Sequence, residues 1–293
     1  MFTILNKQVL ALNVKRLDVK APKIALSSLP GQFVLVCPKE ASRSIPLSIV
    51  DVDTRKGSVT LIIHEIGSTS RTLGDMAIGE AIFSMVGPLG QPLPVGFHGV
   101  VITVATGFGA AQMLPVCRAL KKNGNRVIGI MGAKAKNELM LEAQMRVVCD
   151  ELFIATNDGS YERKGLASLL LAELLSKMNV QAVYAVGSLE MMQAATQLAA
   201  QYHIPIWLTL NTMMGCATGL CGSCRMKVGD AMKWMCLEGP HVDGAEVDFA
   251  YLSRREALLK ELKWGKPNFP QLPKSDGFPI FMKSVLGLIK KKT

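Results

Sequence analysis

The hydrophobic pattern of this 293-residue chain changes once, near residue 99, and the change separates two kinds of structure. Before residue 99, short apolar runs recur between turn signals such as Pro30-Gly31 and Gly87-Pro88. Several short strands at this spacing are typical of a barrel or a sandwich. We therefore predict a β-rich barrel or sandwich over residues 1–98, with strands at residues 9–14, 33–36, 47–50, 59–63 and 81–85.

After residue 99, apolar runs that begin roughly 25 residues apart alternate with stretches of helical pattern. This alternation indicates βα units in a parallel sheet. We predict an α/β domain over residues 99–210, with strands at residues 100–105, 127–131, 152–155, 182–186 and 206–210. Helices are predicted at residues 137–147, 166–177 and 252–262.

Four cysteines follow the last predicted strand: Cys216, Cys221, Cys224 and Cys236. The first three have the C-x4-C-x2-C spacing of a plant-type 2Fe–2S cluster, whose fourth thiolate is distant in sequence. Glycines beside these cysteines permit the sharp turns that wrap a short loop around a cluster. We therefore predict a small 2Fe–2S domain over residues 211–250, with the four cysteines as its metal ligands.

Zinc and disulfides are the other chemistries open to these cysteines. Structural zinc sites usually pair two C-x2-C or C-x2-H knuckles, whereas this loop has one C-x2-C. A disulfide framework is not expected in a chain of this length without a secretory signal. Iron–sulfur is the preferred interpretation, and a zinc-binding regulatory protein is the alternative from another functional class. The remaining cysteines are predicted to be buried small hydrophobes: Cys37, Cys117 and Cys149.

Two strand-to-helix turns of the α/β half could bind a nucleotide. The first predicted strand runs into Gly107 and Gly109 and then into a helix. Such a turn places N–H groups at the positive end of a helix, where a pyrophosphate can bind. Gln112 stands where the dinucleotide fingerprint has its third glycine, so this motif is weak by itself. Gly187 follows another strand and would lie at the same carboxyl edge, where ligands bind.

Two loops of the β-rich half combine groups that can hold a phosphate-bearing cofactor. Cations, hydroxyls and backbone N–H groups all serve as phosphate ligands. Read separately, each loop is also compatible with an ordinary turn. The first loop contributes Arg43, Pro46 and Ser48, and the second contributes Gly67, Thr69 and Ser70.

The net charge of +10 is concentrated at the C-terminal end, because eight lysines and two acidic residues lie from residue 260 onward. A basic chain suggests nucleic-acid binding, but no such motif accompanies the charge, so no nucleic-acid partner is expected. Residues 251–293 are predicted to form a helix and a basic, proline-broken tail that could dock a partner. The alternatives for this tail are a solvated end and a membrane-surface role.

The remaining sequence features concern location. No apolar stretch reaches 18 residues, so no transmembrane segment is expected. The N-terminal residues lack the basic start and apolar run of a signal peptide. Free thiols without a secretory signal indicate a reducing, cytoplasmic location.

The order of these parts resembles the ferredoxin–NADP reductase superfamily, in its branch with a C-terminal 2Fe–2S domain. That branch includes the electron-transfer subunit of dihydroorotate dehydrogenase B. It also includes the small subunit of NADH-dependent ferredoxin:NADP oxidoreductase, to which the similarity is greater. The resemblance covers about residues 5–255 and is carried by the cysteine loop and by residues 132–139, 157–165 and 236–249.

This resemblance implies that residues 1–98 form an antiparallel β-barrel. It also implies FAD between that barrel and the α/β domain, and NAD(P) over Gly107, Gly109 and Gly187. The family's flavin motif falls on Pro46, Leu47 and Ser48, and its second flavin loop on Gly67, Thr69 and Ser70. The nearest arginine, Arg43, lies one or two places earlier than the motif requires. Either it reaches the flavin phosphate by a shifted backbone, or its role is lost.

The function implied is an electron-transfer flavoprotein subunit that passes electrons between NAD(P)H, FAD and a 2Fe–2S cluster. The electrons would go to or from a catalytic partner subunit of a heteromeric oxidoreductase, or ferredoxin. The sequence shows no group of residues suited to general acid–base catalysis, so no catalytic residue is predicted. Cys216 stands where the more similar relatives typically have aspartate, and it restores the four-thiolate set of the dihydroorotate dehydrogenase branch. An electron-transfer subunit of dihydroorotate dehydrogenase is therefore the alternative within this class.

Overall fold

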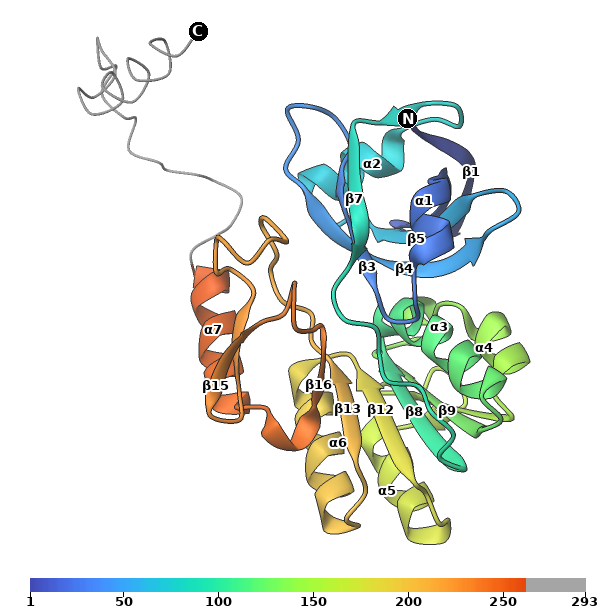
Figure 1. The fold of residues 1–293 in the computed structure, drawn as a ribbon. Coiled ribbons are helices and arrows are strands. Elements are labelled where there is room, and N and C mark those ends of the chain that lie inside the picture. The colour runs from blue at the N-terminus through green and yellow to red at the C-terminus, as the bar shows by residue number, and fades with distance from the viewer. Residues whose placement is uncertain (262–293) are drawn as a thin grey trace, which may run out of the picture. The chain divides into compact units, whose positions relative to one another are not determined.

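A computed structural model describes residues 1–261 (Figure 1). The chain divides into two compact units, Met1–Leu252 and Ser253–Thr293. Helix α7 (Phe249–Glu261) crosses the boundary between them. The first unit holds both main sheets and all seven cysteines, so it contains every predicted site residue. The predicted basic tail beyond residue 261 lies outside the described residues.

Seven antiparallel strands form the first sheet, in the order β6-β1-β2-β5-β4-β3-β7. The outermost strands in this order, β6 and β7, are separated in the chain by Phe83 alone, so the sheet nearly closes into a barrel. Aliphatic side chains such as Leu17, Leu61 and Ile63 fill its interior. Its elements are β1 (Phe2–Ala11), β2 (Val14–Lys20), α1 (Pro22–Ser27), β3 (Phe33–Cys37), β4 (Ile45–Asp53), β5 (Ser58–His64), α2 (Ser68–Asp75), β6 (Ala81–Ile82) and β7 (Ser84–Leu89).

Two predicted strands of the barrel are wrong in their limits. The strand predicted at residues 9–14 is interrupted by the β1–β2 hairpin turn, in which Asn13 has a φ of 58°. Asparagine tolerates this left-handed conformation better than most residues. Leu12 extended the apolar pattern across the turn, although its side chain is 89% exposed. The strand predicted at residues 81–85 divides at Phe83 into β6 and β7.

The second sheet has the order β11-β10-β9-β8-β12-β13-β16, and all but β16 run parallel to their neighbours. Helices α3 and α4 pack on one face, and α5 and α6 on the other (Figure 1). The predicted combination of an antiparallel barrel with a parallel α/β sheet is confirmed. Its elements are β8 (Val100–Thr106), α3 (Gly109–Lys122), β9 (Arg126–Ala133), α4 (Glu142–Val148), β10 (Glu151–Thr156), β11 (Arg163–Lys164), α5 (Ala167–Lys177), β12 (Ala182–Val186), α6 (Leu189–Gln201) and β13 (Ile206–Thr209).

The single helix predicted at residues 137–147 is wrong. The chain forms a short 3-10 turn, η1 (Lys136–Glu138), and then helix α4. Leu141 lies between them with a φ of 61°. A residue in the left-handed region cannot continue a right-handed helix, so the helix must begin after it.

The second sheet reverses its direction of winding between β8 and β12. The chain proceeds from β8 through β9 to β10 on one side, and then crosses to β12 and β13 on the other. In open parallel sheets, ligands bind beyond the carboxyl ends of the strands at such a reversal. The topology therefore brings together the turn at Gly107, after β8, and the turn at Gly187, after β12.

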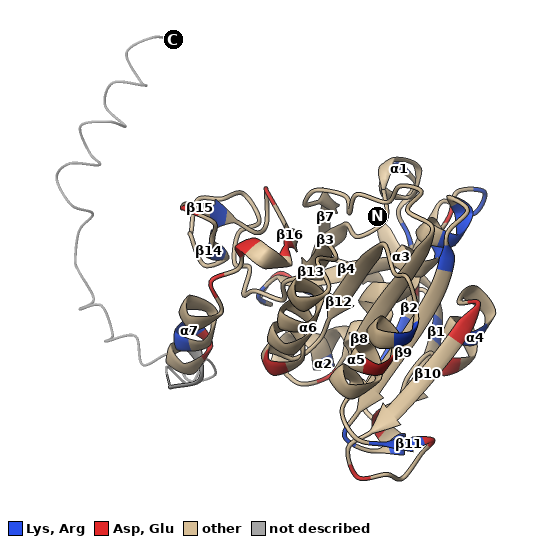
Figure 2. Ribbon diagram, turned by 90° about the horizontal axis from the view of Figure 1, so that it is seen from below, with Lys and Arg blue, Asp and Glu red and all other residues tan. Residues whose placement is uncertain are grey.

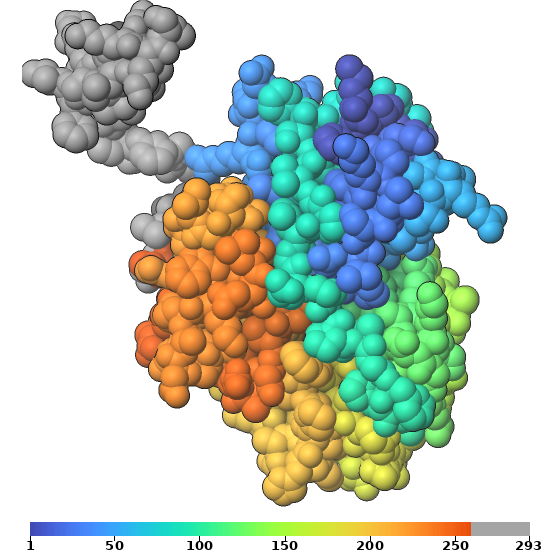
Figure 3. All heavy atoms as spheres, viewed as in Figure 1, coloured from blue at the N-terminus to red at the C-terminus, as the bar shows by residue number. Residues whose placement is uncertain are grey.

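Residues 211–250, here called the cysteine segment, join the second sheet. Strand β16 (His241–Asp243) pairs antiparallel with β13 at the sheet edge. The Gln91 N–H, just after β7, donates to the Gly239 carbonyl at 2.6 Å. In the space-filling view, the cysteine segment lies directly beside β7 (Figure 3). Its other elements are β14 (Arg225–Val228), β15 (Ala231–Trp234) and η2 (Gly244–Glu246).

Charged residues of both signs are interspersed over the described ribbon (Figure 2). Some form ion pairs between the barrel and the α/β half, as the Arg118 guanidinium of α3 does with the Asp51 carboxylate of β4 at 2.8 Å. Among residues 1–261, no helix has the length and apolar character needed to cross a bilayer.

His241 is expected to make the protein less stable in mild acid. Its ring is buried between the Thr209 hydroxyl at 2.9 Å and the Gly31 carbonyl at 3.0 Å, and burial lowers its pKa to about 4. A histidine in an unfolded chain titrates near pH 6.5. Between about pH 6.5 and about pH 4, the unfolded state therefore binds a proton that the folded state does not.

From this group alone, the free energy of unfolding should be constant above about pH 6.5 and fall by about 3 kcal/mol by about pH 4. His241→Gln removes the titration and should flatten that part of the profile. Denaturant unfolding of both proteins across this range measures the difference. Parallel pH profiles for the two proteins would contradict the prediction.

Candidate functional site

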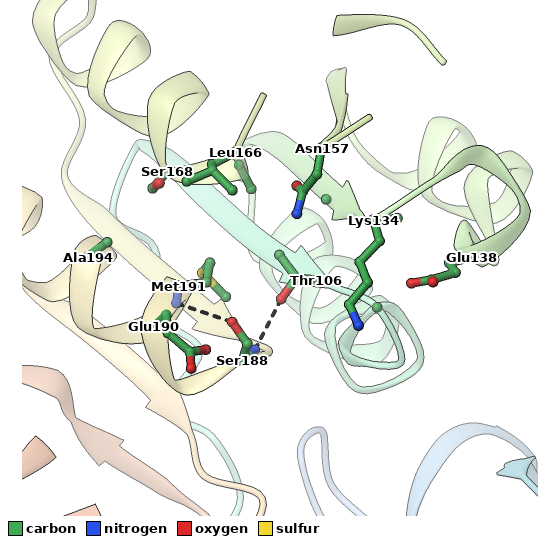
Figure 4. Close-up of a pocket in the computed structure, with 14 residues that line it drawn as sticks. Thr106, Lys134, Glu138, Asn157, Leu166, Ser168, Ser188, Glu190, Met191 and Ala194 are labelled. Atoms are coloured by element: carbon green, nitrogen blue, oxygen red, sulfur yellow. Dashed lines mark hydrogen bonds between the residues drawn. The ribbon is translucent and has the colours of Figure 1, made fainter. Parts of the chain in front are cut away.

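A cavity of about 320 Å³ lies at the carboxyl edge of the second sheet (Figure 4). Four strands contribute to it through the residues that follow them or end them: Thr106 of β8, Lys134 after β9, Asn157 after β10 and Ser188 after β12. The volume is in the range of small-molecule sites. Cation, amide and hydroxyl groups at one edge provide the chemistry that recognises the phosphates and ribose of a nucleotide.

The three predicted glycines serve this edge in two ways. Gly107 lines the cavity with a φ of 55°, and open space lies where a Cβ would project. A Cβ on Gly109 would lie 2.7 Å from the Val186 carbonyl, and one on Gly187 would lie 1.8 Å from the Thr106 hydroxyl. Gly107 therefore leaves room for a ligand, whereas Gly109 and Gly187 let the two turns pack closely.

Thr106 connects the two turns through its hydroxyl, which accepts the Ser188 N–H at 3.2 Å. Ser188 in turn caps α6, because its hydroxyl accepts the Met191 N–H at 3.3 Å. Neither residue is predicted from the sequence as part of a site. Ser188 could have been predicted as a helix cap, because it directly precedes a helical pattern. Thr106 could not, because its hydrogen-bond partner is distant in sequence.

On the barrel side, the predicted flavin residues lie at the start of β4. Arg43 is exposed and precedes the strand by two residues. Leu47 packs into the barrel core, so its side chain points away from the surface, while Pro46 and Ser48 are on the opposite face of β4 and half-buried. Leu47 can therefore contact a cofactor through its backbone but not through its side chain.

The second predicted flavin loop starts helix α2. Gly67 is its N-cap, and Ser70 closes a capping box by accepting the Gly67 N–H and donating to the Gly67 carbonyl, both at 3.0 Å. Ser70 is thus occupied in the cap, while Gly67 and Thr69 remain at the surface. The positive end of the helix can attract a phosphate there.

Helix α2 is anchored to the barrel by an ion pair with limited exposure. The Lys15 ammonium lies 2.7 Å from the Glu65 carboxylate and donates to the Gly74 carbonyl at 3.1 Å. A Cβ on Gly74 would lie 1.8 Å from that carboxylate, so the glycine is required for the fit. These contacts fix the last turn of α2 relative to β2 and to the end of β5.

The barrel loops and the turn after β8 meet one another around the start of α3. The rings of His64, at the end of β5, and Phe108 are stacked with centroids 5.8 Å apart. The Gln112 side chain of α3 donates to the Ser48 hydroxyl at 3.2 Å. Residues predicted from separate motifs thus face one region. Aromatic rings, the exposed Ile66 and the uncovered glycine turns suit a cofactor with a ring system and phosphates, so the residues present fit FAD.

The four predicted cluster ligands are grouped as two pairs. Cys216 is partly exposed and its sulfur accepts the N–H groups of Thr218 and Cys221, both at 3.4 Å. Cys221 is exposed. Cys224 and Cys236 are buried and lie near each other. One pair therefore faces solvent and the other faces the protein core.

The pKa values of these thiols differ with their surroundings. Hydrogen bonds from Thr218 and from the Cys221 N–H lower the pKa of Cys216 to about 6, which favours the thiolate that binds metals. Burial, with the neighbouring Cys224, raises the pKa of Cys236 to about 12. A bound metal ion would supply the positive charge that keeps such a buried thiol deprotonated.

Across residues 1–261, no three His, Cys, Asp or Glu side chains are close enough together to hold one metal ion. A 2Fe–2S cluster has two irons and takes four thiolates. The four cysteines supply that number of ligands, and N–H groups are directed at the Cys216 and Cys221 sulfurs.

Comparisons with known proteins agree with this geometry. The iron–sulfur cluster binding domain of dihydroorotate dehydrogenase B matches residues 211–248. A Thermotoga maritima protein named as a homologue of the dihydroorotate dehydrogenase B (NAD(+)) electron transfer subunit is 33% identical, over 88% of this chain and 91% of that protein. The chain belongs to the family of dihydroorotate dehydrogenase B electron-transfer subunits and their homologues.

Further members and neighbours extend this result. A solved NADH-dependent reduced ferredoxin-NADP oxidoreductase structure matches with a TM-score of 0.84 and 31% identity, over 89% of this chain and 94% of that chain. A Clostridium beijerinckii protein without a described function is 34% identical, over 89% of this chain and 91% of that protein. Phthalate dioxygenase reductase, at 16% identity and a TM-score of 0.55, shares the fold. Family membership confirms the predicted superfamily and the oxidoreductase class.

The two glycines of the first turn should respond differently to alanine. Gly107→Ala fills the open space in the cavity and strains a left-handed residue, so it should weaken NAD(P)H binding about tenfold or more with little loss of fold. Gly109→Ala forces a Cβ against the Val186 carbonyl and should lower the free energy of unfolding by about 1–3 kcal/mol. Nucleotide titration and thermal unfolding of both variants separate the effects. Wild-type NAD(P)H affinity in a folded Gly107→Ala protein would contradict the prediction.

Proposed function

We propose that this protein is an electron-transfer flavoprotein subunit that moves electrons between NAD(P)H and a partner oxidoreductase subunit through FAD and a 2Fe–2S cluster. The observation that carries the proposal is the convergence of three predicted sites within one compact unit, Met1–Leu252. The Ser48–Gln112 contact and the stacked rings of His64 and Phe108 join two of them. The third, the cysteine segment, is hydrogen-bonded to both sheets.

The proposed roles follow the parts of the chain. Residues 1–98 hold the flavin, residues 99–210 hold the nicotinamide nucleotide, and residues 211–250 hold the cluster. The free cysteines support a reducing, cytoplasmic location. The proposed ligands are, for FAD, Arg43, Pro46, Leu47, Ser48, Gly67, Thr69 and Ser70; for NAD(P), Gly107, Gly109 and Gly187; and for the cluster, Cys216, Cys221, Cys224 and Cys236.

When bound, FAD accepts an electron pair from a nicotinamide and releases electrons singly to an iron–sulfur centre. The chain supplies position and electrostatics. Lys134 and the positive end of α3 would hold phosphates at the cavity. The Gly67 turn would do the same for the flavin. N–H groups directed at Cys216 would stabilise negative charge on the cluster sulfurs.

A partner subunit is proposed because the exposed thiol pair lies beside exposed apolar side chains. Leu220, between Cys216 and Cys221, is 90% exposed, and Leu237 is 45% exposed. Apolar surface beside a redox centre suits a protein interface that brings a second centre close. The similarity to the ferredoxin-NADP oxidoreductase structure supports a partner of that type.

A second candidate is the electron-transfer subunit of dihydroorotate dehydrogenase. The match of residues 211–248 to that enzyme's cluster domain favours it, as does the complete set of four cysteines. The two candidates share their cofactors and differ in the partner. Purification from the native cell with the bound partner, followed by identification of that partner, distinguishes them.

Cofactor analysis of the anaerobically purified protein tests the proposal. We expect about one FAD, about two irons and about two acid-labile sulfides per chain. Cys224→Ser should lose the iron and keep the FAD, because Cys224 lies in the cysteine segment, which contains no proposed flavin ligand. Cys37→Ser is the matched control, since serine can keep the contacts of Cys37 with the Lys39 and Ser42 carbonyls. A colourless protein with stoichiometric zinc would overturn the proposal.

A further inference from the structure

A pair of amide side chains joins three parts of the first unit. Gln112, in the first turn of α3, donates to the Asn211 side-chain carbonyl at 2.7 Å, and Asn211 donates back to the Gln112 carbonyl at 3.1 Å. The second N–H of the Gln112 amide donates to the Ser48 hydroxyl at 3.2 Å. Strand β4, helix α3 and the start of the cysteine segment thus share one hydrogen-bonded group, here called the amide bridge.

The amide bridge restricts what the Ser48 hydroxyl can do. A hydroxyl has one hydrogen to donate and two lone pairs that accept. Because Gln112 donates to the Ser48 oxygen, the Ser48 hydrogen is left to donate to another group. Asn211 fixes the orientation of the Gln112 amide, since the reciprocal pair occupies its carbonyl and one N–H.

The proposed nucleotide, flavin and cluster sites give Gln112 and Asn211 no other role. Gln112 stands at the third glycine position of the dinucleotide fingerprint, where a glycine would allow closer packing. Asn211 follows β13 and precedes Cys216 by five residues. The bridge therefore links the proposed flavin face of β4 directly to the segment that carries the cluster ligands.

We propose that Gln112 and Asn211 hold the Ser48 hydroxyl as a hydrogen-bond donor to the bound flavin, and so set the flavin's reduction potential. Gln112 is a positioning residue, because it acts through Ser48. This inference rests on the proposed FAD site. A hydrogen bond or charge beside a redox centre changes the relative stability of its oxidised and reduced forms.

The test is the flavin midpoint potential, measured by anaerobic spectroelectrochemical titration of the holoprotein. Gln112→Met keeps the length of the side chain and removes the amide. It should change the ratio of reduced to oxidised flavin at a fixed potential about tenfold, which corresponds to about 30 mV for a two-electron couple. Ser48→Ala should shift the potential in the same direction, and the double variant should shift it no further.

Two more variants make the outcome specific. Asn211→Leu should reproduce part of the shift, because the Gln112 amide loses its fixed orientation. Gln112→Glu retains the shape and can still accept from Asn211, but adds a negative charge that should lower the potential. Gln197→Met, at an exposed position of α6, is the matched control and should have the wild-type potential.

The results separate this inference from the proposed function. A purified protein that binds no FAD refutes the proposed function itself. A protein with normal FAD content whose potential is unchanged in Gln112→Met overturns only the role of the bridge. Additive shifts for Gln112→Met and Ser48→Ala would also overturn it, because Gln112 would then act independently of Ser48. If Gln112→Met fails to fold, Asn211→Leu carries the same comparison, because it removes the partner that orients the Gln112 amide without adding a charge.

Discussion

The packing of helix α3 against barrel strand β4 is the contact on which the rest of the site depends. Gly109 lets the helix begin close to β12, and the Arg118–Asp51 ion pair and the Gln112–Ser48 hydrogen bond hold the helix on the barrel. An ion pair this exposed contributes little to the free energy of unfolding, so its main effect is to align α3 with β4. The same helix presents its positive end to the nucleotide cavity. One element thereby aligns the proposed flavin face with the proposed nicotinamide site.

The cysteine segment completes this arrangement because it is built into both sheets. Strand β16 extends the parallel sheet, and the buried His241 joins it to the Gly31 turn of the barrel. Cys224 and Cys236 then face the core while Cys216 and Cys221 face solvent. A cluster held by these four residues would have two buried ligands and two ligands near the surface. That placement suits a centre that receives electrons from inside the subunit and passes them to a partner.

The fold class and the family could be predicted from patterns formed by residues close together in the chain. The cysteine spacing, the Gly107 turn and the change of rhythm near residue 99 each reflect constraints between residues close in the chain, and fold and family were confirmed. The hairpin at Asn13 and the break at Leu141 were missed because apolar residues continued the pattern across them. Thr106 and the Gln112–Asn211 pair could not be foreseen, since their partners lie 82 and 99 residues away.

The central claim is that one subunit connects a nicotinamide nucleotide to an iron–sulfur cluster through a flavin. The most direct measurement is anaerobic reduction of the purified protein with NADH or NADPH, followed by visible absorbance and by low-temperature electron paramagnetic resonance. The account predicts bleaching of the flavin band together with the signal of a reduced 2Fe–2S cluster, and loss of that signal alone in Cys224→Ser. The claim would be contradicted if NADH and NADPH reduced the flavin but left the cluster oxidised, in a protein whose cluster dithionite can reduce.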